Sequence, residues 1–421
     1  MLSIRMPRLL ALVLAPLLCT AAVAGAQPVA PAPNAPSVVI RVATFNVSDM
    51  RRDEINDPAN PRLKKIAAII QALRPNVILL NEVSYDTAGS PGFAEGDTPG
   101  ANAQRFVDGF LAVSQGPNLA PIRYRGYMLP TNTGVSSGAD LNNDGKVVTE
   151  YRLPPAPRDG RPAPEDLAYA GDCYGFGTFP GHYGMALLVD PRFKIREDQV
   201  RTFRLLPWDY VDGAMLPQKP DGTPWYSPEQ LKLLRLSSKS HWDVPIELPG
   251  GSVVRFLCSH PTPPVFDGPE KRNARRNHDE IRFWSDYIDG HQYIVDDADK
   301  AGGLTRGAAF VILGDLNADP DEGESLDNPI GKFLLNHPRI AAGAAPTSDV
   351  VLDNLDPDDT SRFKLRVDYV LPSKDLAVRR CGVWRPQEKD GGLAGYPSDH
   401  FPVWAEIEVP LPPDFSKVPT Q

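Results

Sequence analysis

The segment Phe310–Pro320, FVILGDLNADP, constrains the fold of this chain more than any other stretch. Its four leading apolar residues predict a short buried strand, which Gly314 ends. Asp315, Asn317 and Asp319 would then emerge together at the carboxyl end of that strand. A carboxylate and an amide two residues apart suit a hard cation, or a water molecule held for attack on a substrate. The same residues favour turns, so a lone DLN is by itself typical of a turn between two elements.

Three other predicted strands also end in polar side chains. SVVIRVATFNVS carries Asn46 near its end, NVILLNEV carries Glu82, and VVRFLCSH ends in His260. An unpaired carboxylate after an apolar run costs several kcal/mol to bury, so Glu82 is expected to face a cation. For His260, a structural and a catalytic role are both open. Between the first two strands, residues 61–73 have the spacing of an amphipathic helix, which Pro75 stops.

The C-terminal part of the chain adds two further polar groups. RVDYVL places Asp368 inside an apolar run, and SDH places Asp399 and His400 directly before FPVWAEIEV. Apolar and polar residues alternate in that last run, which predicts an antiparallel strand with one buried face.

In chain order the motifs are TFN, NE, a strand ending in His260, GDLN, VDYV and SDH. Each motif is weak alone, but the ordered set, spanning Val38–Val409, resembles the endonuclease/exonuclease/phosphatase superfamily, the deoxyribonuclease-I-like proteins. The resemblance implies an α/β four-layer sandwich, in which two mainly antiparallel β-sheets pack face to face with helices on the outside. It also implies one catalytic pocket where the strand ends of the two sheets meet.

The resemblance implies a divalent-metal site. Glu82 would be the main ligand of Mg²⁺ or Mn²⁺, with Asn46 and Asp399 completing or supporting the shell. Oxygen ligands without a thiolate favour such hard cations over zinc.

The resemblance also implies a catalytic set. Asp315 would orient or deprotonate the attacking water, and Asn317 would hold a phosphate oxygen. Asp368 would orient His400, which raises the pKa of that imidazole and favours its charged form. His260 would face the same phosphate from the other side. Phosphoryl transfer depends mostly on positioning and on neutralising charge, which such residues supply.

Three further residues are candidates for phosphate contact. His182 lies in FPGHYG, where an exposed loop histidine is the alternative. Arg272 and Arg276 lie in KRNARRNHDE, at the start of a predicted amphipathic helix, and a solvated helix start is the alternative for them.

The stretch DLNNDG resembles the start of a calcium-binding loop. Asp140, Asn142 and Asp144 occupy the first, third and fifth ligand positions. Glu150, however, comes one residue before the position at which a bidentate Glu is required. A structural Ca²⁺ site and an Asn-rich turn therefore both remain open.

The two ends and the composition predict the domain organisation. Basic residues, an apolar run and Ala24-Gly25-Ala26 indicate a signal peptide, so a secreted or periplasmic protein without a transmembrane segment is expected. A monomer is expected. The predicted parts are a signal peptide at 1–26, an Ala/Pro linker at 27–36, one domain at 37–410 with insertions at 86–180 and 204–250, and a disordered tail at 411–421.

The charge of the chain bears on its substrate. The formal net charge is −9, and loss of Arg5 and Arg8 with the leader makes it −11. An acidic protein repels polyanions at long range, which favours a small or lipid-linked phosphate ester over a nucleic acid. The basic run KRNARR and the Trp- and Tyr-rich insertions leave a nuclease open. A non-catalytic binding domain is the third alternative, but the chain lacks none of the acidic or histidine positions.

After removal of the leader the chain keeps an odd number of cysteines, Cys173, Cys258 and Cys381. One disulfide at most is then expected within the chain. Cys258 lies in an apolar run and is expected to be a buried free thiol, which leaves a bridge between Cys173 and Cys381 as a hypothesis.

Overall fold

The computed structural model describes residues 36–412 except 159, 342, 344, 353 and 388–391. The chain divides into two units, Met1–Asn34 and Ala35–Gln421, and the described residues all belong to the second. The predicted signal peptide, most of the linker and nearly all of the C-terminal tail lie outside the described residues. Within the described part of the chain, no helix combines the length and the apolar character that a bilayer span requires.

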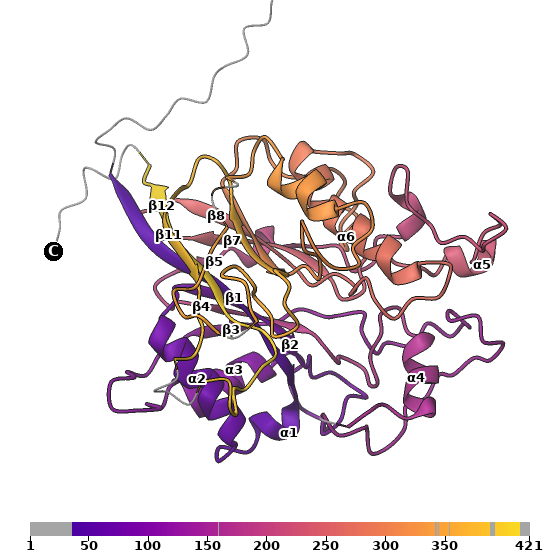
Figure 1. Cartoon of the computed structure of the whole chain (residues 1–421), viewed down its shortest axis with the longest axis horizontal. Helices are drawn as coiled ribbons and strands as arrows, with labels where there is room; N and C mark the ends of the chain where they lie inside the picture. Colours follow the sequence, from indigo (N-terminus) through magenta and orange to yellow (C-terminus); the bar gives the residue numbers. More distant parts are fainter. Residues whose placement is uncertain are drawn as a thin grey trace, which may run out of the picture. The chain divides into compact units, whose positions relative to one another are not determined.

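The first sheet has six strands in the order β11-β12-β1-β2-β4-β3 (Figure 1). β1 pairs in parallel with β2 and antiparallel with β12, and the remaining pairs are antiparallel. The bounds are β1 Ser37–Met50, β2 Val77–Val83, β3 Arg125–Tyr127, β4 Met185–Val189, β11 Ala377–Val383 and β12 Val403–Pro410.

The second sheet has the order β10-β9-β8-β7-β5, and a short strand, β6, also pairs with β7. β8 and β9 are parallel, and the other pairs are antiparallel. The bounds are β5 Lys194–Ile195, β6 Arg201–Thr202, β7 His241–Glu247, β8 Val253–Ser259, β9 Phe310–Asp315 and β10 Asp368–Pro372.

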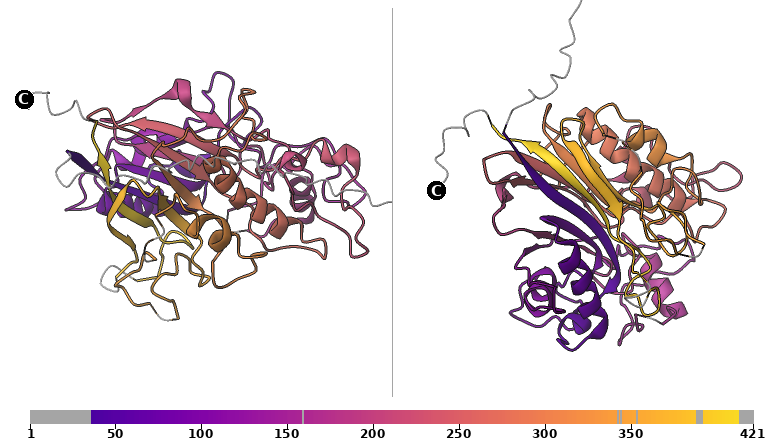
Figure 2. Two further views of the ribbon diagram at one scale, coloured as in Figure 1. Left: turned by 90° about the horizontal axis from the view of Figure 1, so that it is seen from above. Right: turned by 60° about the vertical axis from the view of Figure 1, so that its left-hand side comes forward.

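The two sheets face each other and carry helices on their outer faces (Figure 2), so the predicted four-layer sandwich of mainly antiparallel sheets is confirmed. Alternation along β1 shows how this happens, because successive side chains of a strand point to opposite faces. Ile40 and Val42 belong to the core between the sheets. Ala43 and Phe45 belong to the core beneath the helices of the first sheet.

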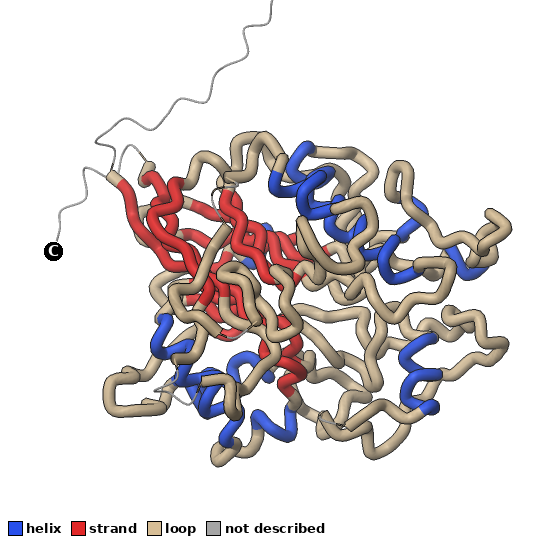
Figure 3. Tube along the Cα trace, viewed as in Figure 1, coloured by secondary structure: helices blue, strands red, loops and turns tan. Residues whose placement is uncertain are grey.

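Helical segments lie on both sides of the strands (Figure 3). α2 begins after Asn60, whose side chain accepts hydrogen bonds from two backbone N–H groups, and it ends at Arg74 in a left-handed conformation. α6 packs Ile281, Trp284 and Ile288 against the second sheet. The bounds are α1 Arg52–Ile55, α2 Pro61–Leu73, α3 Asn102–Phe106, η1 Val107–Leu111, α4 Pro164–Gly171, η2 Glu197–Gln199, η3 Trp208–Tyr210, α5 Pro228–Leu231, α6 Arg272–Asp289 and η4 Ile330–Leu335.

The second insertion differs from the prediction of 204–250, because its last part forms β7 in the body of the second sheet. Asp243 and Pro245 interrupt the apolar pattern there and conceal the strand in the sequence. In the fold, Asp243 is compensated by Arg255, whose Nε lies 2.8 Å from both carboxylate oxygens. The first insertion, 86–180, contributes α3, β3 and α4.

All three described cysteines are unpaired, so the disulfide between Cys173 and Cys381 is not formed. Cys173 is buried, whereas Cys381 is exposed on β11. Cys258 is the buried free thiol that its apolar run predicts.

Candidate active site

Strand pairing explains why polar side chains from distant parts of the chain meet at one edge. β1 and β2 are parallel, as are β8 and β9, so the carboxyl ends of each pair lie together. β10 starts at this edge, because Asp368 pairs antiparallel with Asp315 at the end of β9. β12 runs antiparallel to β1, and it is therefore preceded at the same edge by Asp399 and His400.

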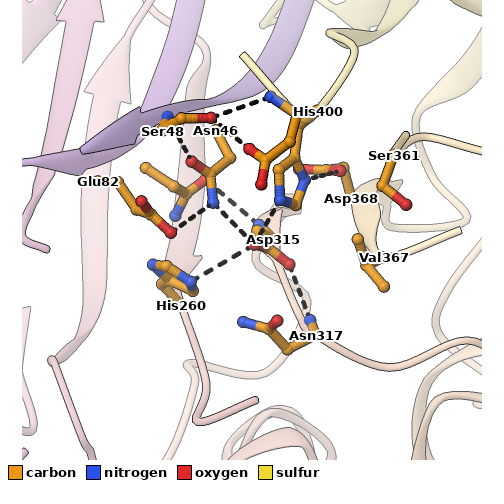
Figure 4. Close-up of polar contacts among 12 residues, drawn as sticks. Asn46, Ser48, Glu82, His260, Asp315, Asn317, Ser361, Val367, Asp368 and His400 are labelled. Atoms are coloured by element: carbon orange, nitrogen blue, oxygen red, sulfur yellow. Dashed lines mark hydrogen bonds and ion pairs between the residues drawn. The ribbon is translucent and has the colours of Figure 1, made fainter. Parts of the chain in front are cut away.

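The amide of Asn46 joins the two sheets at this edge (Figure 4). Its Nδ2 donates to Glu82 Oε1 at 3.0 Å and to Asp315 Oδ2 at 2.9 Å. Its Oδ1 accepts a hydrogen bond from the backbone N–H of Ser48 at 2.9 Å. Asn46 therefore presents donors to both carboxylates, which makes it a support of a metal shell in this arrangement rather than an oxygen ligand.

Asp315 lies at the centre of the site, with its carboxylate buried. Its Oδ2 is 3.4 Å from His260 Nε2 and 3.7 Å from His400 Nε2, and its Oδ1 accepts the N–H of Asn317 at 2.9 Å. Burial opposes ionisation, but the charge of His400 and the hydrogen bond from His260 outweigh it and hold the pKa of Asp315 well below its usual range. Asp315 is therefore an ionised acceptor at neutral pH.

His400 and Asp368 form the pair that the family resemblance implies. His400 Nδ1 lies 2.9 Å from Asp368 Oδ2. Burial alone would lower the pKa of His400, but the charges of Asp368 and Asp315 raise it to about 10. Burial raises the pKa of Asp368 to about 6 against the charge of His400. Between these values the imidazole is protonated, and it offers a charged donor next to Asp315.

His260 differs from His400 in charge. Burial and the nearby ammonium of Lys239 lower its pKa to about 4, so its imidazole is neutral at physiological pH. His260 therefore supplies a neutral hydrogen-bond donor and not a second positive charge. The neutral ring donates through Nε2 toward Asp315, and Nδ1 has no hydrogen-bond partner among the described residues.

Glu82 occupies a strained position at the end of β2. Its φ is +64°, a left-handed conformation that is rare for a side chain of this kind. Burial and the negative charges of Asp399 and Asp49 raise the pKa of Glu82 to about 7, against a hydrogen bond from Asn46. A bound cation would relieve this uncompensated acidic group, so the residues present fit a divalent metal.

Asp399 lies on the exposed side of the same group of residues. Its backbone N–H donates to Ser48 Oγ at 3.0 Å, and Ser48 Oγ also contacts its carboxylate. Ser398 Oγ donates to the carbonyl of Asn46 at 2.7 Å. These contacts attach the SDH segment to the end of β1, which brings Asp399 near Glu82.

A second set of potential metal ligands overlaps the group of residues around Asp315. Asp315, Asp368 and His400 each offer one ligand atom within 4.8 Å of the others. An imidazole that ligates a metal must give up its proton at the ligating nitrogen, and His400 Nδ1 is engaged with Asp368. The donor chemistry therefore favours Glu82 as the metal-binding carboxylate.

The model of the Endonuclease/Exonuclease/phosphatase family matches residues 43–400. The chain belongs to this family. Family members are hydrolases that act on phosphate esters and generally depend on divalent metals. No curated protein matches the chain.

Solved structures of the family resemble this chain at low sequence identity. The endonuclease/exonuclease/phosphatase from Beutenbergia cavernae DSM 12333 is 18% identical, with a TM-score of 0.46, over 88% of this chain and 72% of that one. The human Nocturnin catalytic domain with bound sulfate anion is 17% identical, with a TM-score of 0.44, over 89% and 99%. ANGEL2, a 2',3'-cyclic phosphatase, in complex with adenosine-2',3'-vanadate, is 14% identical, with a TM-score of 0.43, over 89% and 97%.

His182 is buried in this family member, not exposed as its loop position suggests. Its ring stacks between Phe179 and Tyr183, at centroid distances of 4.2 and 3.6 Å. Its Nδ1 accepts the N–H of Thr178, and its Nε2 lies 3.1 Å from Asp49 Oδ1. The N–H of Asp49 in turn donates to Glu82 Oε2 at 2.9 Å. His182 therefore reaches the site through Asp49 and Glu82.

The two candidate arginines of α6 face backbone carbonyls. Arg276 donates to the carbonyls of Leu236, Tyr174 and Arg235 at 2.7 to 2.9 Å. Arg272 donates to the carbonyl of Leu141 at 3.1 Å. These contacts fasten the insertions to α6, and the guanidinium of Arg276 is thereby occupied within the protein.

The DLNNDG loop closes on itself. Asp140 accepts the N–H groups of Asp144 and Gly145, and Asn142 Oδ1 also accepts that of Asp144. Asp144 accepts the N–H of Lys146. These bonds describe an Asx-rich turn, and a bound Ca²⁺ stays a prediction.

A cavity of about 470 Å³ adjoins the site beside Asp399. Ser48 and Asp399 form part of its wall. Four basic residues also line it, namely Arg62, Lys65, Arg158 and Arg362. The charged lining of this cavity is therefore mainly basic, on a protein whose net charge is negative.

Lys239 is the site residue that sequence reasoning missed. It is buried, and its charge acts on His260. The surrounding letters, SSKSHWD, give no signal of this, because a lysine between serines is typical of an exposed loop.

Asp368→Asn should lower kcat/KM about 10²-fold at pH 9, because Asp368 contributes most to raising the pKa of His400. In the wild-type protein, kcat/KM is expected to fall at alkaline pH near pH 10, where His400 loses its proton. In the variant this fall is expected at clearly lower pH. A pH–rate profile of both proteins measures this. If kcat/KM falls at the same alkaline pH in both proteins, Asp368 does not control the charge of His400 that catalysis uses.

Proposed function

We propose that the protein is a divalent-metal-dependent phosphoesterase that hydrolyses a phosphodiester or phosphomonoester by in-line attack of water. One observation carries the proposal. Asp315 is buried and ionised, with the protonated His400 and the neutral His260 beside the same carboxylate oxygen. A water acceptor and a charged donor at one point are parts that phosphoryl transfer needs.

The proposed metal, Mg²⁺ or Mn²⁺, would be held by Glu82 with Asp399, and Asn46 would support the shell. When bound, such an ion supplies charge neutralisation for the phosphate oxygens. Strain and burial at Glu82 support this assignment.

The protein residues would divide the remaining work. Because its pKa is low, the Asp315 carboxylate is a weak base, so we assign it the orientation of the attacking water through a hydrogen bond. His400 would donate a hydrogen bond from its Nε2–H group to a phosphate oxygen, and Asp368 would hold the ring in orientation. Asn317, whose Nδ2 donates to the carbonyl of Pro261 at 3.1 Å, would lie beside the same phosphate.

A small or lipid-linked phosphate ester is the favoured substrate class. Three of the residues that suggest a nuclease have structural roles here. Trp208 and Trp242 are fully buried, and Arg276 is bonded to backbone carbonyls. The basic cavity beside Asp399 suits a substrate with compact negative charge.

We also propose that the protein is exported, with cleavage after Ala26. The proposal rests on the sequence of residues 1–26 alone. Mass analysis of protein recovered outside the cytoplasm should then give an N-terminus at Gln27, and an intact leader would contradict it.

A parallel hydrolysis screen tests the proposed function. The substrates are bis-p-nitrophenyl phosphate, p-nitrophenyl phosphate, sphingomyelin, duplex DNA and single-stranded RNA, each with Mg²⁺ and with EDTA. We expect metal-dependent turnover of small or lipid-linked esters at rates well above those on DNA and RNA. Faster turnover of DNA or RNA would favour a nuclease function. Absence of turnover with every substrate would contradict the proposal that the protein is an enzyme.

A further inference from the structure

Lys239 is a buried cation beside the active site. It belongs to a run of buried polar residues, 237–241, that leads into β7, and only 6% of it is exposed. Lysine is almost never buried to this degree without a partner of opposite charge. Its environment therefore requires an explanation.

The position of the ammonium is fixed by a carbonyl at the site. Lys239 Nζ donates to the carbonyl oxygen of Pro261 at 3.1 Å. The same oxygen accepts the Asn317 Nδ2 amide at 3.1 Å, and Pro261 directly follows His260. Lys239 thus stands next to two residues already placed around the phosphate.

The ammonium has no ion-pair partner in the part of the chain that the structure describes. No carboxylate among the described residues lies within 4.0 Å of it, and its hydrogen bond to Pro261 uses one of three N–H donors. Glu280 is the strongest nearby opposing charge. Its oxygens, however, accept the N–H and Oγ of Ser238 and the N–H of Thr262.

The carboxylates of the site act electrostatically on the ammonium of Lys239. Burial lowers the pKa of its ammonium, whereas the carboxylates of Glu280, Glu82 and Asp315 act in the opposite direction. A buried cation with unused donors, held near these groups, is arranged to receive an anion.

We propose that Lys239 is a further catalytic residue, whose ammonium donates to a non-bridging oxygen of the substrate phosphate. The proposal rests on the proposed phosphoesterase function. The contact strengthens as negative charge grows on the phosphoryl oxygens, so it contributes to rate as well as to binding. A structural role would instead consist only of the bond to Pro261.

The test separates these two roles. Lys239→Gln removes the charge but keeps an N–H donor for Pro261, and Lys332→Met, at an exposed lysine, is the control for loss of charge. We expect Lys239→Gln to lower kcat about 10²-fold and to weaken inhibition by inorganic phosphate at least 10-fold, with Mg²⁺ present. Lys332→Met should change neither quantity.

Unchanged turnover and phosphate inhibition in folded Lys239→Gln would overturn the proposal. So would lost turnover with unchanged phosphate affinity, because Lys239 would then act only through Pro261.

The wild-type protein provides a measurement that needs no variant. In an NMR spectrum of its lysine ammonium groups, inorganic phosphate should shift the Lys239 Nζ resonance with the affinity seen in inhibition. Absence of a shift at saturation would contradict the contact. The NMR titration needs no turnover, so it can show the phosphate contact of Lys239 even if the hydrolysis screen shows no activity. Failure of the Lys239 proposal can therefore be distinguished from failure of the proposed phosphoesterase function.

Discussion

Asp315→Asn is expected to lower kcat for phosphate-ester hydrolysis by about 10³-fold or more, with the fold intact. The substitution removes the anion that, in the proposed mechanism, accepts a hydrogen bond from the attacking water. It also removes the charge that His260 and His400 contact. The same change removes one of the carboxylates that raise the pKa of His400, so the charged donor is weakened at the same time. Steady-state kinetics on bis-p-nitrophenyl phosphate with saturating Mg²⁺ measures the loss.

Asp319→Asn is the matched control, since it lies four residues further along the same segment. Its carboxylate accepts the backbone N–H groups of Asp321, Glu322 and Arg366. Loss of stability of about 1 kcal/mol with unchanged kcat is expected for this variant. If Asp315→Asn keeps full activity, or if both variants lose it equally, Asp315 does not have the assigned role.

The polar strand ends could be predicted from sequence because their signal is local. An apolar run followed by a carboxylate, as at Glu82 and Asp315, predicts both that a strand is buried and that the side chain at its end needs a polar partner. The parallel pairs β1–β2 and β8–β9 then bring these ends together. The ordered motifs predicted the fold through their resemblance to a known family.

The protonation states could not be predicted in the same way, because they depend on distances between remote residues. His260 and His400 are both buried histidines near Asp315. Asp368 makes one a cation, whereas Lys239 helps to keep the other neutral. Nothing in the local sequence of either histidine states which neighbour it will acquire.

Tertiary compensation also concealed β7 and Lys239. Asp243 argues against a buried strand until Arg255 is placed across from it. Lys239 looks like a solvated loop residue until the first insertion covers it, as the hydrogen bond from Asn132 N–H to the Lys239 carbonyl shows. Hydrophobic periodicity does not detect a polar group whose partner lies far along the chain.

Backbone strain marks the same edge of the sheets. Ser48, Asp49, Glu82 and Asn317 all have left-handed backbone conformations, with φ between +51° and +64°. None of them is glycine, so each costs free energy that the surrounding contacts must offset. The concentration of such residues around Asp315 is consistent with a site shaped for function at some expense of stability.

Glu82→Gln should abolish metal-dependent activity and, in the same protein, stabilise the metal-free fold at alkaline pH. The folded-state pKa of Glu82 is raised from 4.5 to about 7, so protonation of this residue favours the folded state. Its stabilising contribution is complete below pH 4.5 and is lost as pH rises through about 7. At pH 8 in EDTA the ionised carboxylate therefore costs up to about 3 kcal/mol of folding stability, which Gln avoids.

We expect a higher Tm for the Glu82→Gln variant under these conditions, together with a loss in kcat of about 10³-fold. Mg²⁺ should raise the Tm of the wild-type protein but have little effect on the Tm of the variant. Glu197→Gln, at an exposed ion pair with Arg125, should leave all of these quantities unchanged. A variant that is active, or a wild-type protein whose Tm and turnover ignore both EDTA and Mg²⁺, would remove Glu82 from the metal site.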